Sequence, residues 1–460
     1  MKIVVLNGSP KGELSVTMQY IQFVQKKFPQ HQFKILNVAF EILRLEKNEN
    51  YFKEMITEVK TSDGIIWAFP LYFMLVCSQY KRFIELIFER NVKDAFYKKF
   101  AAIVATSIKF FDHTAIEYIR SICDDLDMIF IDSYSAKMDD LFNKECQNQL
   151  ISFANNFILS VEKKLISAKQ YSPLIHRAFE YKTSDSLSQK RSISTNQKKV
   201  LIVTDSTNQD SNIWKMINTV QNCFSGPIEV INLYDIDIKG GCLGCIRCGY
   251  DNQCAYDHKD GFRDFWNNKM ITADVLIFAG TIKDRYLSSR WKMVFDRSFF
   301  NGHVPTITGK QIGFLISGPI SQIANLKQIF TAFVEIQESN LVDIVSDEFG
   351  DSKDIDLLLY NFAEKLIRFS NSTYKTPPTF LAIGGVKIFR DNVYESLRGV
   401  FQADHRYYKK YGYYDFPKKI FGSRLLKLAF KMKGFRKVMY KNNRLQHEMI
   451  KPLKKLVQKA

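Results

Sequence analysis

The sequence predicts an α/β protein with two doubly wound parallel-sheet domains, followed by a basic, mainly helical C-terminal region. Short apolar runs alternate with amphipathic stretches of helical length, which is typical of a parallel sheet covered by helices. The alternation stops near residue 166 and restarts near residue 199. Most of the formal net charge of +17 lies after residue 370. At 460 residues the chain is long enough for two or three domains.

The first domain is expected to span residues 1–165. A Ser-, Lys- and Gln-rich stretch at 166–198 then breaks the pattern and is expected to be a linker. Within the first domain we expect strands at 3–6, 33–36, 64–68, 101–106 and 128–131, and helices at 15–27, 78–88, 113–123 and 145–165.

The second domain is expected to span residues 199–370, and a third, basic region residues 371–460. The second domain repeats the strand-and-helix alternation of the first. We expect strands at 200–204, 228–233, 275–279 and 312–317, and helices at 212–223, 290–297, 322–338 and 355–369.

The two domains are predicted to be copies of one unit. Ser9 and Ser206, which follow the first strand of each copy, lie 197 residues apart. Three later landmarks are offset by 211 residues instead, so the second copy holds 14 additional residues, about the length of 242–254. That segment is therefore expected to be an insertion. The landmarks Pro70, Lys81 and Glu85 match Thr281, Lys292 and Asp296.

The insertion carries four closely spaced cysteines, Cys242, Cys245, Cys248 and Cys254. Thiolates at a C-x2-C-x2-C-x5-C spacing suit an iron–sulfur cluster or a structural zinc ion. Two local disulfides or four unliganded thiols are the alternative. The remaining cysteines are scattered along the chain, so the spacing does not follow from a cysteine-rich composition: Cys77, Cys123, Cys146 and Cys223.

Charge and hydropathy separate the body of the chain from its tail. Residues 371–460 hold 21 Lys or Arg against five Asp or Glu, whereas residues 1–370 hold 44 against 43. The N-terminus is a short apolar run followed by Asn7-Gly8-Ser9-Pro10, which predicts a buried strand and not a signal peptide. Because no run approaches the roughly 18 apolar residues needed to span a bilayer, we expect a cytoplasmic protein, with peripheral membrane association as an option for the tail.

The tail contains a candidate basic helix at 423–440, after interruptions at Pro377-Pro378 and Gly384-Gly385. Its apolar residues recur every three or four positions. We expect it to bind either an anionic membrane surface or an acidic redox protein; no nucleic-acid motif accompanies it, so no nucleic acid is expected. Alternatively the apolar stripe packs on the second domain. The stripe consists of Leu425, Leu428, Met432, Phe435 and Met439.

Two loops of the first domain carry the chemistry. Residues 7–17 join the first strand to the first helix and offer hydroxyls, a lysine and the backbone N–H groups of a helix start, which suit a phosphate; a Ser/Thr-capped turn is the alternative. The spacing matches neither a nucleoside-triphosphatase loop nor a dinucleotide-binding loop. Residues 69–73 follow the third strand at the carboxyl edge, and their proline and aromatic rings suit a flat heterocycle.

These motifs together resemble the NAD(P)H-dependent FMN reductase family of flavodoxin-like proteins. The resemblance rests on G-S-P-x-x-x-x-S-x-T at residues 8–17, P-x-Y at 70–72 and K-x-F-I-E at 81–85, and it covers residues 1–165. It implies that the FMN phosphate is held by Ser9, Lys11, Ser15 and Thr17. It also implies that the isoalloxazine ring is bordered by Pro70, Leu71, Tyr72 and Phe73, with Ser107 as a further candidate.

The second copy resembles the iron–sulfur flavoprotein branch of the same superfamily, which implies a [4Fe–4S] cluster on the four cysteines near FMN. Two departures stand out. The loop at 204–212 has no glycine and two acidic residues, and P-x-Y has become Thr281-Ile282-Lys283. Either Lys283 and Arg285 face a flavin, or they form ion pairs with Asp284 or Asp296.

The resemblance implies a flavin-dependent oxidoreductase that passes electrons from NAD(P)H through FMN to an unidentified acceptor. A [4Fe–4S] cluster, or zinc, is an added expectation. Because the flavin performs the redox chemistry, we assign no catalytic side chain. The alternative is an electron carrier or membrane-docked redox module without a small-molecule substrate. Relatives often dimerise so that one subunit completes the other's flavin site, which implies a homodimer or the same arrangement within one chain.

Overall fold

A computed structural model describes residues 1–184, 192–415, 421–441 and 444–458. The chain divides into two compact units, Met1–Tyr407 and Tyr408–Ala460. The domain boundaries expected from the sequence, at 165, 198 and 370, stay predictions. Within the described part of the chain, no helix has both the length and the apolar character needed to cross a membrane.

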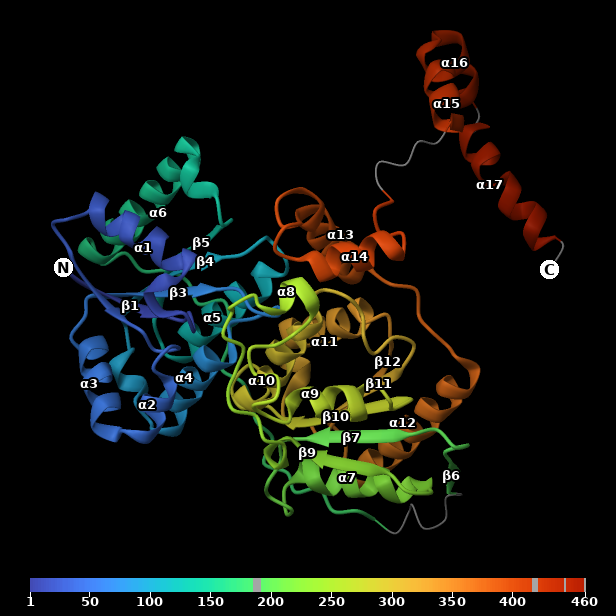
Figure 1. The fold of residues 1–460 in the computed structure, drawn as a ribbon, viewed down its shortest axis with the longest axis horizontal. Coiled ribbons are helices and arrows are strands. Elements are labelled where there is room, and N and C mark those ends of the chain that lie inside the picture. Colours follow the sequence, from blue (N-terminus) through green and yellow to red (C-terminus); the bar gives the residue numbers. More distant parts are fainter. Residues whose placement is uncertain (185–191, 416–420, 442–443, 459–460) are drawn as a thin grey trace. The chain divides into compact units, whose positions relative to one another are not determined.

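The first sheet is fully parallel, with the strand order β2-β1-β3-β4-β5 (Figure 1). Helices α1 and α6 pack on one face, and α2, α3 and α4 lie on the other. The strands are β1 (Lys2–Asn7), β2 (Gln32–Leu36), β3 (Gly64–Pro70), β4 (Phe100–Thr106) and β5 (Ile129–Ala136). The helices are α1 (Val16–Lys27), α2 (Ile42–Lys47), α3 (Glu49–Lys60), α4 (Ser78–Glu89), α5 (Asp112–Asp125) and α6 (Lys144–Glu162).

The second sheet has the same topology, since its order β12-β11-β10-β7-β9 is the first order read from the other edge. The doubly wound α/β fold predicted for both copies is confirmed. The strands are β7 (Val200–Thr204), β9 (Glu229–Asn232), β10 (Val275–Thr281), β11 (Gln311–Ser317) and β12 (Asn340–Ser346). The main helices are α7 (Asn212–Cys223), α10 (Ser289–Ser298), α11 (Ala324–Ile336) and α12 (Ser352–Ser372), with short α8 (Cys248–Asp251) and α9 (Phe262–Phe265) in and after the insertion.

The central strands form where the sequence is apolar without interruption. Residues of β3 and β4 are buried on both faces of the sheet, apart from Pro70 at the end of β3, which is why these segments read as continuous apolar runs. The edge strand β2 alternates exposed and partly buried residues instead, and only its last residue, Leu36, is buried. Sequence reasoning missed α2 and α3, and also β12, whose apolar run is interrupted by Asp343.

The predicted linker makes specific contacts with the second domain. Residues 166–184 contain neither helix nor strand. Their backbone is nevertheless fixed, because the N–H of Ile175 donates to Gln322 (2.9 Å) and that of Tyr181 donates to Asn212 (2.9 Å). Farther along, β6 (Ile193–Ser194) pairs with β8 (Phe224–Ser225). Part of the linker therefore belongs to the packed body of the protein.

The C-terminal region is helical, as expected, but its internal boundaries differ from the prediction. Helix α13 (Phe380–Glu395) continues through Gly384-Gly385, which the sequence suggested as an interruption. Gly385 is buried against Phe110, where a side chain would lie only 2.9 Å from the ring. The single helix expected at 423–440 is two helices, because Met432 is extended. The remaining helices are α14 (Gln402–Lys410), α15 (Phe421–Lys431), α16 (Lys433–Tyr440) and α17 (Arg444–Val457).

Candidate functional site

The loop after β1 is folded on its own polar groups. The Ser9 N–H donates to Asn7 Oδ1 (3.0 Å), and the Lys11 N–H donates to Ser9 Oγ (3.2 Å). Gly12 takes a φ of +57°, which turns the chain into α1. Ser9 is buried and Lys11 is partly exposed. The loop therefore places a hydroxyl and an ammonium group beside the start of α1.

Helix α1 begins in this loop with a side-chain cap. Ser15 accepts a hydrogen bond from the Met18 N–H (3.2 Å). The first N–H groups of a helix have no partner within the helix and carry partial positive charge, so they attract an anion. Thr17 is fully buried, and its hydroxyl lies 2.6 Å from that of Thr106 at the end of β4. Thr17 thus joins the helix start to the neighbouring strand.

The loop after β3 lies beside the end of β4. Pro70 pairs in register with Thr106, and the Leu71 N–H donates to the Thr106 carbonyl (2.9 Å). Tyr72 and Leu75 close a tight turn through two backbone hydrogen bonds of 2.8 and 2.7 Å. Ser107 follows β4 and bonds to the end of β5. The loops after β1, β3 and β4 therefore meet at the carboxyl edge of one sheet, where open α/β sheets bind ligands.

Phe73 points into the contact between the two domains. Its ring stacks on Phe295 of α10, with 6.3 Å between centroids, and meets Phe333 of α11 edge-on at 5.8 Å. The neighbouring Tyr72 contacts the cysteine segment of the second domain. The structure therefore gives Tyr72 and Phe73 different surroundings, although the sequence prediction assigned both to one ring-binding loop.

The cysteine segment lies against the first domain through two glycines. A Cβ on Gly244 would collide with the Tyr72 hydroxyl, and one on Gly241 would lie 2.8 Å from the Gln79 side chain. Gly244 also has a φ of +62°, a conformation that favours glycine. The Gln79 amide donates to the Cys242 carbonyl (3.1 Å). A loop of the second domain thus borders the predicted flavin loop of the first.

The four cysteines of this segment are free thiols. Cys245 is exposed and the other three are partly buried. Burial is the main cause that raises the pKa of Cys248 to about 12, and repulsion from the thiolates of Cys254 and Cys245 contributes to the same value. Metal ligation needs deprotonated thiols. Among the described residues, no group of three or more His, Cys, Asp or Glu side chains is arranged to hold a metal ion. The residues as placed do not fit the expected cluster or zinc ion.

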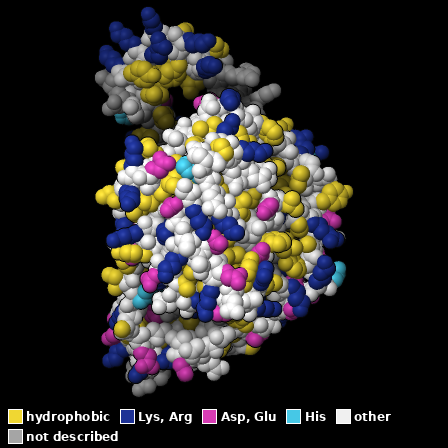
Figure 2. Space-filling model, turned by 90° about the vertical axis from the view of Figure 1, so that its left-hand side faces the viewer, with side chains coloured by type: hydrophobic (Ala, Val, Ile, Leu, Met, Phe, Trp, Pro, Cys, Tyr) yellow, Lys and Arg dark blue, Asp and Glu magenta, His cyan; other side chains and the backbone are white. Residues whose placement is uncertain are grey.

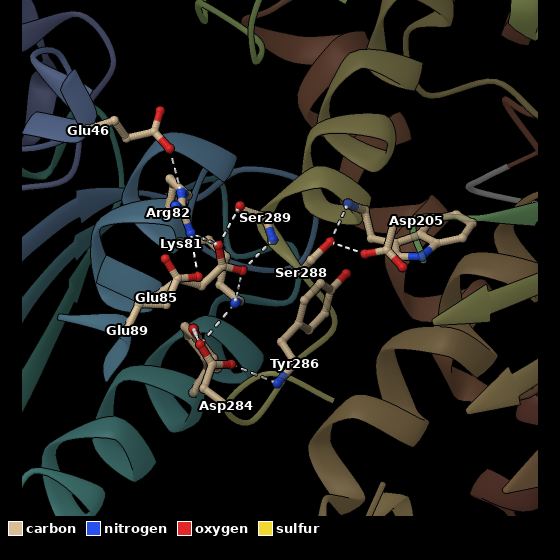
Figure 3. Close-up of polar contacts among 12 residues, drawn as sticks. Glu46, Lys81, Arg82, Glu85, Glu89, Asp205, Asp284, Tyr286, Ser288 and Ser289 are labelled. Atoms are coloured by element: carbon tan, nitrogen blue, oxygen red, sulfur yellow. Dashed lines mark hydrogen bonds and ion pairs between the residues drawn. The ribbon is translucent and has the colours of Figure 1, made fainter. Parts of the chain in front are cut away.

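The two domains meet through the matching helices α4 and α10, and each helix start is capped by the other domain. Glu85 on α4 accepts hydrogen bonds from the Ser289 N–H (2.5 Å) and hydroxyl (2.6 Å) (Figure 3). Reciprocally, Asp296 on α10 accepts from the Ser78 N–H (2.7 Å). These four residues are related by the same 211-residue offset. The contact therefore has the self-complementary form of a two-fold dimer interface.

Two fully buried lysines compensate the negative charge of the acidic residues in this contact. Lys81 Nζ lies 2.8 Å from Glu85 and 2.9 Å from Asp284, and Lys292 pairs with Asp296. Burial raises the pKa of Asp284 and Asp296, and the lysines oppose it. For Glu85, burial acts in the same direction, but Lys81 outweighs it and holds the pKa below its usual value. Sequence reasoning found four of these residues as repeat landmarks without assigning them a role.

The corresponding edge of the second domain is filled by its own side chains. Asp205 stands where the first domain has Gly8, and it accepts a hydrogen bond from Ser288. Asp347, after β12, accepts from Ser317 Oγ (2.7 Å) and from the Gly318 N–H (2.8 Å). These carboxylates bind groups of the second domain itself.

The linker also crosses this edge of the second domain. The side chain of Asn212, the first residue of α7, donates to the Phe179 carbonyl (2.9 Å). A cavity of about 110 Å³ remains between linker and strand ends, well below the roughly 300 Å³ at which ligand pockets begin. It is lined by residues that include His176, Arg177, Phe179, Thr281, Ser317 and Asp347.

Arg285 has a partner that the sequence did not suggest. Its guanidinium pairs with Asp125 of the first domain (2.6 and 2.7 Å) and donates to the Ser172 carbonyl (2.6 Å). The alternative in which Arg285 pairs with Asp284 or Asp296 is wrong, because the buried lysines hold both carboxylates, and the prediction that Arg285 faces a flavin stays a prediction. Lys283 is exposed on the neighbouring turn.

Comparisons with known proteins agree with the first-domain motifs. Residues 1–140 match the family model described as NADPH-dependent FMN reductase. No curated protein matches the chain. The match supports a flavin-dependent oxidoreductase that uses NAD(P)H.

Three similar solved structures cover about a third of this chain. The first is an NADH:FMN oxidoreductase, EMOB, in its apo form, with 20% sequence identity, coverage of 36% of this chain and 90% of that chain, and a TM-score of 0.30. The second is the NAD(P)H:(acceptor) oxidoreductase FerB from Paracoccus denitrificans, with 16% identity, coverage of 35% of this chain and 97% of that chain, and a TM-score of 0.30. The third is the Trp repressor binding protein from Bacillus subtilis, with 16% identity, coverage of 32% of this chain and 95% of that chain, and a TM-score of 0.27. The loop motifs, the strand order and the family match all lie in the same part of the chain, residues 1–140, which is similar to the NADPH-dependent FMN reductase family.

Proposed function

We propose that the protein is an NAD(P)H-dependent flavin oxidoreductase that binds one FMN per chain, in the first domain. The observation that carries this proposal is the meeting of the loops after β1, β3 and β4 at one sheet edge within the family match. FMN, when bound, takes a hydride from NAD(P)H and passes electrons on. The acceptor is a quinone, an aromatic compound or another protein.

The donors of the first loop suit a phosphate. The oxygen atoms of Ser9 and Ser15 each accept a backbone N–H, from Lys11 and Met18 respectively, which leaves each hydroxyl proton free to be donated. The start of α1 and the Lys11 ammonium add positive charge, and the carboxylate of this loop, Glu13, is exposed to solvent. Buried hydroxyl donors next to a helix start fit the phosphate of FMN, so these residues are proposed to hold it.

Tyr72 is proposed to border the flavin ring from the side of the second domain. Burial raises the pKa of Tyr72 well above its usual value, and Cys242 and Cys77 raise it further. The hydroxyl therefore stays protonated and able to donate a hydrogen bond at neutral pH. Because Gly244 packs against this hydroxyl, the cysteine segment orients Tyr72 and shields it from water. In this proposal the second copy completes the site within one chain.

We propose that the second domain binds no flavin. The loop after its first strand presents Asp205, where a phosphate would meet a negative charge. At the start of α7, the side chain of Asn212 already donates a hydrogen bond to the Phe179 carbonyl of the linker. No electron-transfer step is assigned to the four cysteines. A [4Fe–4S] cluster, zinc, a homodimer and the cytoplasmic location stay predictions.

The test compares two matched helix caps. Ser15→Ala removes the cap of α1, and Ser211→Ala removes the cap of α7, which accepts from the Trp214 N–H (3.4 Å). Each substitution should cost about 0.5–2 kcal/mol of stability. A hydrogen bond to a charged group is worth about 1.5–3 kcal/mol, so Ser15→Ala should also weaken FMN binding roughly ten- to hundredfold. FMN titration of the apoprotein measures this, and equal affinities in both variants would contradict the proposed site.

An electron carrier without a small-molecule substrate is the second candidate function. The charge of the C-terminal region favours it, since 21 basic against five acidic residues could dock an acidic partner or surface. Steady-state oxidation of NADPH with a soluble quinone separates the two. Turnover supports the reductase, whereas flavin that binds but is not reduced by NADPH or NADH supports the carrier.

A further inference from the structure

The last helices of the chain each have an apolar face that is exposed to solvent. In α17, Leu445, Met449, Leu453 and Leu456 follow one another at intervals of four, four and three residues, which places them on one side of a helix. Met449, Leu453 and Leu456 are 69%, 61% and 65% exposed. A contiguous stripe of aliphatic side chains with this much exposure is unusual on the surface of a soluble monomeric protein and marks an interaction site.

Basic residues occupy the opposite side of α17. At 100° per residue, Lys451, Lys454 and Lys455 fall between about 180° and 280° from Leu445, while the other three residues of the apolar stripe fall between about 20° and 80°. All three lysines are exposed. Helix α17 therefore separates cationic from apolar side chains almost completely.

Helices α15 and α16 repeat this arrangement. Leu428 and Val438 are exposed apolar residues in α15 and α16, and Met432 is an exposed apolar residue between these helices. Lys431 and Lys437 are exposed beside them. In Figure 2, dark-blue Lys and Arg side chains adjoin yellow hydrophobic ones on the helices of this unit. The three helices thus share one chemical pattern.

The charge of this segment has a single sign. From residue 418 to the end the chain holds 14 Lys or Arg and one acidic residue, Glu448. Glu448 lies 3.6 Å from Lys451, with both side chains exposed. The partner must therefore be anionic, and it must also cover apolar faces.

We propose that α15, α16 and α17 form an interfacial membrane anchor that lies in the surface of a bilayer containing anionic phospholipid. Apolar faces enter among the acyl chains, and the lysines and arginines meet lipid phosphates. These helices, of 8 to 14 residues, are too short to span a bilayer. Nucleic acid would satisfy the charge but would leave the apolar stripe of α17 in water. The inference does not depend on the flavin site.

The test uses the full chain and two matched triple variants. Lys451→Gln, Lys454→Gln and Lys455→Gln remove charge from α17, whereas Lys26→Gln, Lys47→Gln and Lys60→Gln remove the same charge from exposed positions of the first domain. Co-sedimentation is measured with vesicles of phosphatidylcholine alone or mixed with phosphatidylserine. Each lysine near an anionic surface contributes roughly fivefold, so the α17 variant should bind mixed vesicles roughly a hundredfold more weakly. The first-domain variant should bind them as the unmodified chain does.

The apolar contribution needs its own variant, Leu453→Gln with Leu456→Gln. Raising the salt from about 0.1 M to about 1 M shortens the screening length from about 10 Å to about 3 Å. The unmodified chain should keep measurable binding at high salt through its apolar faces, and this variant should lose it. Far-ultraviolet circular dichroism checks that each variant folds.

Three outcomes would overturn the proposal. The first is equal binding of the α17 and first-domain lysine variants to mixed vesicles. The second is that binding at high salt is the same with and without Leu453 and Leu456. The third is tight binding to duplex DNA without binding to mixed vesicles, which would assign the charge to a nucleic-acid partner.

Discussion

Replacing Glu85 by Gln is expected to destabilise the protein by about 3–5 kcal/mol, because it removes the negative charge at the centre of the contact between the domains. Glu85 is 5% exposed. It accepts hydrogen bonds from the Ser289 N–H (2.5 Å), the Ser289 hydroxyl (2.6 Å), the fully buried Lys81 ammonium (2.8 Å) and the Arg82 guanidinium (3.0 Å). Glutamine has nearly the same shape, so the change concerns charge and not volume.

The magnitude follows from these four bonds. Hydrogen bonds to charged groups are worth about 1.5–3 kcal/mol each, which gives a gross loss of roughly 6–12 kcal/mol. Two effects reduce it. Asp284 still pairs with Lys81 at 2.9 Å, and the glutamine oxygen still accepts one bond from Ser289. The net loss should therefore fall within the range of about 3–5 kcal/mol measured when one partner of a buried ion pair is removed.

The assay is urea unfolding followed by tryptophan fluorescence at neutral pH, with Glu49→Gln as the control. Glu49 is 54% exposed at its side chain and pairs with Arg90 (3.1 Å), so its loss should cost about 0–1 kcal/mol. Because the folded-state pKa of Glu85 lies below its usual value, its contribution is complete above the unfolded pKa of about 4.3 and is lost as the pH falls through the folded pKa. The difference between wild type and Glu85→Gln should therefore shrink in acid. A loss at neutral pH within 1 kcal/mol of that in Glu49→Gln would refute this reasoning.

Two further predictions concern the cysteine segment. Gly244→Ala should weaken FMN binding to the first domain roughly tenfold or more, because the added Cβ collides with Tyr72 and because the positive φ of Gly244 strains any other residue. The control Gly399→Ala, at a position with open space around it, should leave the affinity unchanged. Equal FMN titrations of the two variants would contradict the contact between Gly244 and Tyr72. In native protein, iodoacetamide should label the exposed Cys245 first, whereas the buried Cys77 and Cys123 should react only after unfolding. A content of about four iron and four sulfide ions per chain in anaerobic preparations would show instead that the loop rearranges around a cluster. In that case Cys248→Ser should abolish both the iron and the sulfide.

The fold could be read from the sequence where burial alone determines structure. Strands β3 and β4 are buried on both faces, and their apolar runs predicted them to within one or two residues. Strand β12 was missed because Asp343 interrupts its apolar run at the sheet edge. The break in the predicted tail helix at Met432 was also missed, because lysine and apolar residues continue through it with helical spacing.

The site was predictable in part. Residues at strand ends could be placed at one edge because all parallel strands end there, and the loops after β1, β3 and β4 do meet. Contacts that form only when the two domains pack together leave no periodic pattern in the sequence. Gly244 against Tyr72, and Arg285 paired with Asp125 from 160 residues away, are of this kind. The 211-residue offset related Glu85 to Asp296, but it gave no sign that each caps the other's helix.

This exchange of caps explains how the second copy can lose flavin-binding features without losing its place in the molecule. A self-complementary contact needs the helix start and the carboxylate of both copies, so Ser289 and Asp296 remain necessary for the first domain even if the second binds no ligand. At the carboxyl edge of the second sheet, Asp205 and Asp347 are hydrogen-bonded within the second domain, which avoids the cost of buried unpaired carboxylates. The loop between β9 and β10 is under neither constraint, and it is the part of the second copy that reaches Tyr72. In the division of roles that we propose, one copy keeps the cofactor loops and the other supplies the contact surface that completes them.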